Sequence, residues 1–359
     1  MSEKPTVVVA MSGGVDSSVT AGLLVEQGYR VIGMMLRLWS ETGKEDTNRC
    51  CTPDAMSQAR RIAAKLGIPF YALDVQKSFR AIVVESFLSG YSQGITPNPC
   101  LLCNRKIRWG ALYEEALSLG AEYMATGHYV RTRKQENGWV NLLRGVDTAK
   151  DQSYVLSVLS QEQFQHSLFP VGELSKPEVR KLARKWGFSV ADRPDSQDLC
   201  FLAGGDYRDF LSRHAPETVN PGEIIDGNGK VIGQHQGLAY YTIGQRKGLG
   251  IASAKPLYVV AKLIDRNQLV VGEKAELGGQ VFLAENFNWL IEEIPSEPFT
   301  AEVKIRYKAR EVVALISPET DNRVKIHLQE PLRDITPGQQ AVLYQGDLCL
   351  GGGIITDMG

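Results

Sequence analysis

The chain has 359 residues, 43% of them hydrophobic and 23% charged, which is ordinary for a globular protein of two or three domains. Its net charge of −1 means that a polyanionic partner must bind a local basic surface, and its six cysteines are too few for a disulfide scaffold. The N-terminus lacks the regions of a signal peptide, and no apolar run approaches the roughly 18 residues that span a bilayer. We therefore expect a cytoplasmic protein without membrane contacts.

Residues 1–205 alternate apolar strands with helical patterns. Thr52 and Pro53 mark the start of one helix and Gly67 marks its end. This alternation predicts an α/β domain with a parallel sheet, helices on both faces, and ligands at the carboxyl ends of the strands. The expected strands are 6–11, 30–38, 70–75 and 121–129, and the expected helices are 16–28, 52–67 and 104–120.

From about residue 206 the pattern changes to short alternating strands with glycine-rich and asparagine-rich turns. Hairpins are expected over 222–235 and 258–273. We expect a small β-rich central domain over 206–278 and a C-terminal antiparallel β-barrel over 279–359.

The strongest motif is AMSGGVDSS, residues 10–18, between the first strand and the first helix. Its glycines let backbone amides turn inward, its serines add hydroxyls, and the helix presents its positive end, so the segment predicts a phosphate nest. It lacks the lysine of a P-loop, and Asp16 is suited to holding Mg²⁺ on a leaving pyrophosphate. The stretch resembles the PP-loop ATP pyrophosphatases, and this resemblance implies that ATP adenylates a substrate.

Two cysteines indicate which chemistry follows activation. Cys103 stands near the start of the helix expected from about residue 104, whose positive end activates a thiol, and Cys200 stands in a polar segment. Sulfur transfer needs one cysteine to carry a persulfide and another to discharge it as a disulfide. A single cysteine is more often a small buried hydrophobic residue. We expect this of Cys349 and assign no role to Cys50 and Cys51.

Seven segments together resemble the tRNA-specific 2-thiouridylase family along the whole chain. They are AMSGGVDSS, TPNPCLLCNRKIRW, MATGHY, KDQSYVL, DSQDLCF, GQRKGLG and CLGGGII. The resemblance implies ATP-dependent 2-thiolation of the wobble uridine in a subset of tRNAs, with sulfur loaded by a persulfide donor protein. It also implies that Cys103 is the nucleophile or acid–base, that Cys200 carries the persulfide, and that the pair closes a transient disulfide.

The same resemblance implies the binding residues. The target uridine would be held by Asn98, Pro99 and Cys100. The ATP contacts would be Ala10, Met11, Ser12, Gly13, Gly14, Val15, Asp16, Ser17, Leu36 and Gly127. The tRNA contacts would be His128, Lys150, Asp151, Gln152, Arg306, Tyr307 and Gln345.

Cys100 departs from many members of the family, which carry Asp at this position. Cys100, Cys103 and Cys200 would suffice for an iron–sulfur cluster with one open site, and a zinc site would need His128 as a fourth ligand. The simpler interpretation is that Cys100 lines the uridine pocket. Both interpretations stay open on the sequence.

RNA binding requires a basic surface. The alternation in EVKIRYKARE, residues 302–311, predicts a strand with four cations on one face, which suits a phosphate backbone but also a charged edge strand. Arg246 and Lys247 stand on a glycine-flanked turn. The four cations of the predicted strand are Lys304, Arg306, Lys308 and Arg310.

Other polar residues are placed by the expected elements. His128 follows a strand and so lies at the carboxyl edge of the sheet, and residues 150–152 begin a helix. A further helix starts with a capping box from Ser175 to Glu178, and its cations form a solvated face. These cations are Arg180, Lys181, Arg184 and Lys185.

Two other functions use part of the same pattern. An AMP-forming amide synthetase would share the phosphate nest, but it would need an ammonia source and would not require Cys200. A non-catalytic RNA-binding or metal-binding module would leave SGGVDSS unexplained. An ATP–pyrophosphate exchange assay with and without tRNA separates the second alternative from an enzyme.

Overall fold

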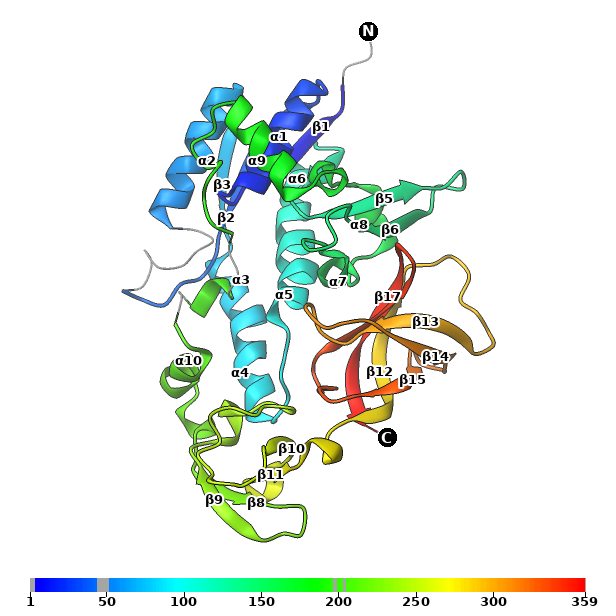
Figure 1. Cartoon of the computed structure of the whole chain (residues 1–359). Helices are drawn as coiled ribbons and strands as arrows, with labels where there is room; N and C mark the ends of the chain where they lie inside the picture. Colours follow the sequence, from blue (N-terminus) through cyan, green and yellow to red (C-terminus); the bar gives the residue numbers. More distant parts are fainter. Residues whose placement is uncertain (1–3, 44–51, 196–198, 203–204, 359) are drawn as a thin grey trace.

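A computed structural model describes residues 4–43, 52–195, 199–202 and 205–358 (Figure 1). An N-terminal α/β part, a small β-rich part and a C-terminal barrel follow one another along the chain, from blue to red. Cys50, Cys51 and residues 196–198 of the DSQDLCF segment lie outside the described residues. No helix in the described part of the chain is long and apolar enough to cross a bilayer.

The predicted parallel sheet is confirmed, with strand order β3-β2-β1-β4-β7. Its central strand alternates its side chains between two cores: Val7 and Val9 face one core, and Val8 faces the other. The strands are β1 (Thr6–Ala10), β2 (Arg30–Arg37), β3 (Phe70–Asp74), β4 (Tyr123–Ala125) and β7 (Ser167–Leu168).

One face of the sheet is covered by α1 (Val15–Glu26), α2 (Pro53–Leu66) and α9 (Lys176–Lys185). The predicted ends of α2 are confirmed, because the Thr52 hydroxyl accepts the Ala55 amide and Gly67 is left-handed. Further helices are α3 (Gln76–Phe79), α4 (Glu85–Ser92), α7 (Ser153–Leu156) and α8 (Gln161–Gln165), with a π-helical turn η2 (Arg80–Val84) between α3 and α4.

A long helical segment covers the other face. It runs through α5 (Pro99–Leu102), the π-helical η3 (Cys103–Leu112) and α6 (Tyr113–Ser118). The helix predicted from about residue 104 therefore begins five residues earlier, because Asn98 caps it and Pro99 occupies its first position. The prediction that residues 150–152 begin a helix is also wrong: they precede α7.

The small β-rich part contains both predicted hairpins. Its strand order is β10-β11-β8-β9, in which β11 and β8 pair in parallel, so the two hairpins share one sheet. The elements are α10 (Tyr207–His214), β8 (Gly222–Ile225), β9 (Val231–His235), β10 (Tyr258–Leu263) and β11 (Gln268–Gly272).

The C-terminal part is an antiparallel barrel of six strands, as predicted, and the pairing of β12 with β17 closes it. A hairpin of the N-terminal part, β5 (Val130–Lys134) and β6 (Val140–Arg144), extends the barrel sheet through the pair Leu143–Leu348. The barrel strands are β12 (Gly279–Trp289), β13 (Phe299–Lys304), β14 (Val312–Pro318), β15 (Val324–Leu332), β16 (Gln340–Gln345) and β17 (Leu348–Met358).

The predicted cationic strand face over residues 304–310 is wrong. Strand β13 ends at Lys304, and the chain then forms a turn before β14. Lys304 and Arg310 form ion pairs with Glu311 and Glu330, at 3.6 and 3.2 Å. The alternation of charges therefore does not correspond to a single basic surface.

Candidate active site

The segment predicted as a phosphate nest forms the turn between β1 and the first turn of α1. Gly13 has a φ of 70°, and a Cβ there would lie 2.4 Å from the carbonyl oxygen of Ala55, so only glycine fits. The Ser17 hydroxyl accepts the amide of Ser12 at 3.2 Å, and the Ser18 hydroxyl donates to the carbonyl of Gly14 at 2.7 Å. The serines thus hold the turn in shape.

The predicted ATP residues converge at the carboxyl edge of the sheet. Ala10 ends β1, Leu36 lies at the end of β2, and Gly127 follows β4, and these three strands are parallel neighbours. A Cβ on Gly127 would lie 2.7 Å from the amide nitrogen of Ser17, so Gly127 packs directly on the first turn of α1. Met11 and Val15 are buried beneath the turn.

Asp16 is hydrogen-bonded inside this edge. The Lys176 ammonium lies 2.7 and 2.8 Å from its two carboxylate oxygens, and the Tyr129 hydroxyl donates to it at 2.6 Å. Burial, together with the Asp16 carboxylate, raises the pKa of Tyr129, so this hydroxyl remains a donor. A Mg²⁺ ion at Asp16 would meet a suitable hard oxygen ligand but would have to replace the Lys176 ammonium.

A second carboxylate, Asp195, lies beside Asp16 and forms ion pairs with three cations. Lys150, Lys176 and Arg180 lie 2.7, 2.9 and 3.0 Å from its oxygens. Burial would raise the pKa of Asp195, but the hydrogen bonds from the two lysines outweigh it and lower the pKa to about 2. The sequence singled out neither Lys176 nor Asp195, because no local pattern links α9 to the nest.

The two predicted catalytic cysteines share one hydrophobic cluster. Cys103 is buried on η3, and Cys200 is half-buried at the start of the short helical turn η5 (Cys200–Leu202). Phe201, next to Cys200, packs edge-to-face on Phe87 with ring centroids 5.1 Å apart. Cys103 is the fifth residue of its helix, so the positive helix end lies nearer to Cys100 than to Cys103.

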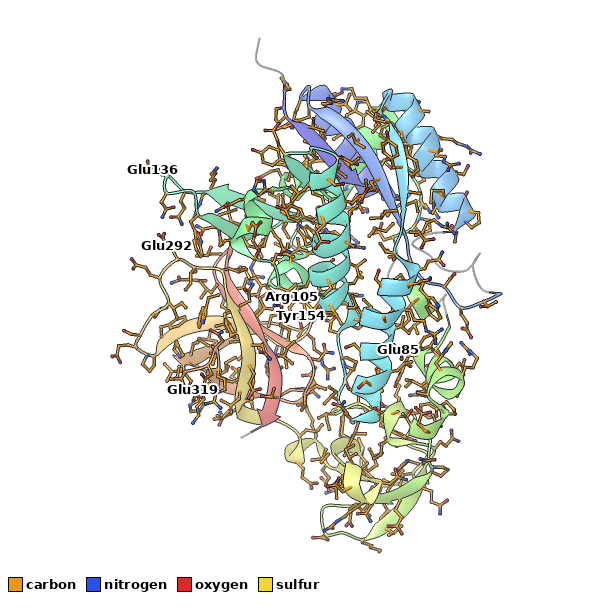
Figure 2. The ribbon with its side chains drawn as sticks, turned by 180° about the vertical axis from the view of Figure 1, so that it is seen from behind. Glu85, Arg105, Glu136, Tyr154, Glu292 and Glu319 are labelled. Atoms are coloured by element: carbon orange, nitrogen blue, oxygen red, sulfur yellow. The ribbon has the colours of Figure 1, made fainter. Side chains whose placement is uncertain are left out.

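Cys100 is exposed in the first turn of α5, where its amide donates to the Asn98 carboxamide at 3.2 Å. Tyr307, on the turn after β13, lies near it and packs against Tyr154 with ring centroids 6.2 Å apart. The structure therefore brings the predicted uridine residues beside the predicted tRNA-contacting turn of the barrel. Tyr154 is labelled between this helix and the barrel in Figure 2, and its hydroxyl donates to the Gln340 carbonyl at 2.9 Å.

Two other residues that are predicted to contact tRNA are buried and form hydrogen bonds with protein groups. His128 is buried, and its Nε2 lies 3.1 Å from the Arg108 guanidinium, which can only donate. His128 therefore carries its proton on Nδ1, 2.8 Å from the Thr126 hydroxyl. The buried Asp151 carboxylate accepts the amides of Gly145 and Ser153, both at 3.1 Å.

The remaining predicted tRNA residues differ in exposure. Gln152 is half-buried, and its carboxamide oxygen accepts the Tyr129 amide at 3.0 Å. Arg306 forms an ion pair with Asp334 at 3.5 Å and donates to the Thr336 hydroxyl. Gln345 is exposed at the end of β16. Their contacts with RNA stay predictions.

The donor set for a metal cluster is not assembled. Within the described ranges, no three His, Cys, Asp or Glu side chains converge in an arrangement that could hold a metal ion. Cys100 is exposed whereas Cys103 is buried. We therefore assign no step of the chemistry to an iron–sulfur or zinc site.

Three family models match the chain in succession. A model described as a tRNA methyl transferase HUP domain matches residues 5–204, a tRNA methyl transferase PRC-barrel domain matches 208–273, and an aminomethyltransferase beta-barrel domain matches 279–355. The first of these models covers more than half of the chain.

Full-length relatives are similar from end to end, and each is named tRNA-specific 2-thiouridylase MnmA. That of Carboxydothermus hydrogenoformans is 49% identical over 97% of both chains. That of Moorella thermoacetica is 47% identical over 97% of this chain and 98% of its own. That of Magnetococcus marinus is 44% identical over 99% of this chain and 100% of its own. This chain therefore belongs to the tRNA-specific 2-thiouridylase family.

Proposed function

We propose that this protein is an ATP-dependent tRNA sulfurtransferase that replaces O2 of the wobble uridine with sulfur. The observation that carries the proposal is that one chain combines a strand–turn–helix segment of the phosphate-nest type with a helix bearing Cys100 and Cys103. Full-length similarity to 2-thiouridylases favours this function over an AMP-forming amide synthetase. A reducing cytoplasm is the setting we propose, because the chemistry needs reduced thiols.

The first step activates the uridine. Its O2 attacks the α-phosphate of ATP, and pyrophosphate leaves with the electrons of the broken bond. The backbone amides of residues 13–17 and the N-terminus of α1 stabilise the phosphates. Mg²⁺, held by Asp16 and the phosphate oxygens, would neutralise charge on the leaving group.

Sulfur transfer follows at C2. The terminal sulfur of a Cys200 persulfide attacks C2 and AMP leaves, so that C2 is joined to Cys200 through a disulfide. The Cys103 thiolate then attacks the Cys200 sulfur, which leaves the outer sulfur on C2 as the thiocarbonyl and joins the two cysteines. A thiol reductant supplies two electrons to reopen that bond, and a persulfide donor protein reloads Cys200.

Substitution of the two cysteines tests this sequence of steps. We expect Cys200→Ser and Cys103→Ser each to abolish 2-thiouridine, measured by mass spectrometry of digested tRNA, because each serine blocks one sulfur exchange. Both variants should retain tRNA-dependent ATP–pyrophosphate exchange, since the nest is intact. Cys349→Ser is the matched control, because Cys349 is buried in the barrel. Thiolation by both variants would refute the proposal.

The uridine site lies where the helix and the barrel meet. A wobble base must leave the anticodon loop to reach a protein pocket. Asn98, Pro99 and Cys100 form the first turn of the helix, and Tyr307 offers an aromatic face beside them. We infer that Cys100 lines this pocket without itself transferring sulfur.

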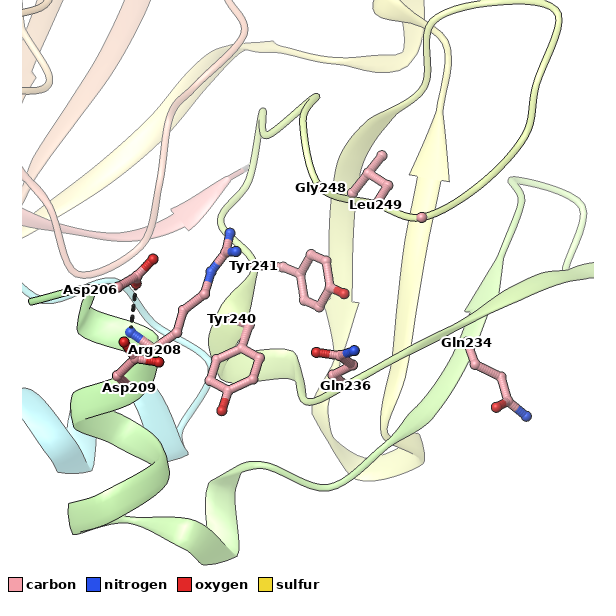
Figure 3. A pocket seen from close by; sticks show the side chains of 10 residues that line it. Asp206, Arg208, Asp209, Gln234, Gln236, Tyr240, Tyr241, Gly248 and Leu249 are labelled. Carbon is pink, nitrogen blue, oxygen red and sulfur yellow. Dashed lines mark hydrogen bonds between the residues drawn. The ribbon is translucent and has the colours of Figure 1, made fainter.

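We also propose that the central part, residues 206–278, contacts tRNA. It holds a pocket of about 440 Å³ into which Tyr240, Tyr241 and Gln236 point (Figure 3). Arg208 also lines this pocket, and the exposed Arg246 and Lys247 stand on the adjoining loop. Guanidinium, amide and phenol groups suit phosphates and the edges of unstacked bases.

The loop beside that pocket is tested with full-length tRNA. We expect the double substitution Arg246→Gln and Lys247→Gln to weaken tRNA binding by about tenfold at low salt, because two phosphate contacts are lost. Lys255→Gln is the matched control, since Lys255 is exposed and already paired with Glu273 at 2.6 Å. An unchanged dissociation constant in a gel-shift titration would exclude this loop from the RNA interface.

A further inference from the structure

Three cations and two carboxylates meet at the edge of the phosphate nest. Lys176 bridges both carboxylates: its ammonium lies 2.7 Å from Asp16 and 2.9 Å from Asp195. Lys150 and Arg180 bind the same Asp195 at 2.7 and 3.0 Å. The three cations face these two carboxylates, and a third carboxylate, Asp147, accepts the backbone amide of Lys176 at 2.9 Å.

The cluster stands at the edge of the nest, where we expect the phosphates of a bound nucleotide to lie. Asp16 belongs to the nest itself, and the Lys176 side chain is only 10% exposed, so its charge is little screened by water. Arg193 also reaches the nest, where it donates to the Gly13 carbonyl at 3.1 Å, and it is itself paired with Asp54 at 3.4 Å. The nest supplies backbone amides but no lysine of its own, so the cations that meet a polyphosphate come from elsewhere in the chain.

A purely structural ion-pair network is the competing interpretation. Helix α9 carries such a pair one turn further on, where Arg184 meets Asp192 at 2.7 Å. That pair is one-to-one, with side chains 57% and 78% exposed, and it resembles the surface pairs that contribute little to stability. The Asp195 cluster differs because one carboxylate is shared by three cations in a half-buried place, an arrangement that favours a further anion.

We propose that Lys150, Lys176 and Arg180 bind the β- and γ-phosphates of ATP and the departing pyrophosphate. Asp195 occupies their site as an internal anion until the phosphates displace it. The exchange also releases Asp16 from Lys176, which leaves its carboxylate available to a cation on the phosphates. This inference rests on the proposed function and assigns the pyrophosphate subsite of that same reaction.

The proposal predicts that substitutions of Lys176 and Asp195 have opposite effects on the affinity for pyrophosphate. Inorganic pyrophosphate is titrated calorimetrically into the full-length protein in EDTA, so that metal ions do not contribute. Lys176→Met should weaken binding by about tenfold or more, because a little-screened ion pair is lost. Asp195→Asn should tighten binding by several-fold, since the competing anion is gone.

Matched variants separate this result from misfolding. Arg184→Gln and Asp192→Asn alter the exposed pair between α9 and the turn that follows it, and they should leave pyrophosphate binding unchanged. Lys150→Gln removes the most exposed of the three cations, with a side chain 35% exposed, and should weaken binding by several-fold without affecting the melting temperature.

Two results would overturn the proposal. Equal weakening by Asp195→Asn and Lys176→Met would mean that Asp195 only organises the lysines. Wild-type affinity in a folded Lys176→Met or Lys150→Gln protein would place pyrophosphate elsewhere. Because the titration uses neither tRNA nor sulfur, its outcome is independent of a thiolation assay, whose failure would instead count against the proposed function.

Discussion

The environment of His128 differs from the one that its position in the sequence predicts. Its position after β4 predicts a group at the open edge of the sheet, but its ring is buried, tilted on Trp109 with centroids 5.7 Å apart and bonded to Arg108. Burial and the neighbouring Arg108 guanidinium hold the pKa of His128 well below its usual range. The imidazole is therefore neutral, and it orients Arg108 on the helix that carries Cys103.

This neutral state predicts a pH dependence of stability. The unfolded chain binds a proton at His128 as pH falls through about 6.5, whereas the folded chain does not, so folding loses up to about 1.4 kcal/mol per pH unit in that range. Urea unfolding at about pH 7.5 and 5.5 should show a smaller loss for His128→Gln than for wild type. His235, whose pKa is also lowered by burial, contributes equally to both proteins. Equal losses would contradict the prediction.

At the scale of the element, the segment over residues 99–118 determines where the site residues point. Its start at Pro99 places Cys100 and Cys103 three residues apart on one helix, with one thiol exposed and the other in the core. The Asn98 cap thus positions both the residues that we propose hold the uridine and the cysteine that we propose takes part in sulfur transfer. A helix that began at residue 104 would leave Cys100 in a loop.

Two substitutions of Asn98 separate its role as a helix cap from its proposed role in base recognition. We expect Asn98→Ala to lower the free energy of unfolding by about 1 kcal/mol, because the cap to the Cys100 amide is lost. Asn98→Asp keeps the capping oxygen and should lose less stability than Asn98→Ala, while it replaces the amide that is hydrogen-bonded to Tyr154 and that we propose meets the base. Unfolding curves and thiolation rates together check this. Normal thiolation by Asn98→Asp would remove Asn98 from base recognition.

At the scale of the molecule, Arg144 joins the N-terminal part to the barrel. It donates to Glu311 at 2.6 Å and to the Gly346 carbonyl at 3.0 Å, and its guanidinium lies 3.7 Å from the Tyr344 ring centroid. Hairpin β5–β6, on which Arg144 stands, pairs with β17. The proposed uridine site lies across this same junction, so its shape would depend on how firmly the two parts are joined.

A double-mutant cycle measures that junction. We expect Arg144→Gln and Glu311→Gln to show a coupling of about 1 kcal/mol or more in unfolding free energy, because the pair is largely shielded from water. The exposed pair Arg310–Glu330 is the matched control, with side chains 69% and 66% exposed, and its coupling should be near zero. Equal coupling energies for the Arg144–Glu311 and Arg310–Glu330 pairs would mean that Arg144 does not stabilise the contact between the N-terminal part and the barrel.

The confirmed predictions depend on neighbouring residues. The parallel sheet, the capped helix α2, both hairpins and the buried Cys349 follow from hydrophobic period, cap residues and turn residues within short stretches. The errors have local causes as well. The charge alternation past Lys304 predicts a strand, although the chain turns there, and the pattern from residue 104 predicts a helix that in fact starts at Pro99 after the Asn98 cap.

By itself the sequence determined the class of fold and the strand–turn–helix segment that it predicts to be a phosphate nest, because adjacent residues encode both and their geometry follows from backbone chemistry. Only the tertiary structure decided that Lys150, Lys176 and Arg180 meet on Asp195, that His128 and Asp151 are buried, and that a hairpin of the first part extends the barrel. These contacts join residues far apart in the chain. They arise from the packing of whole elements, which no short stretch of sequence encodes.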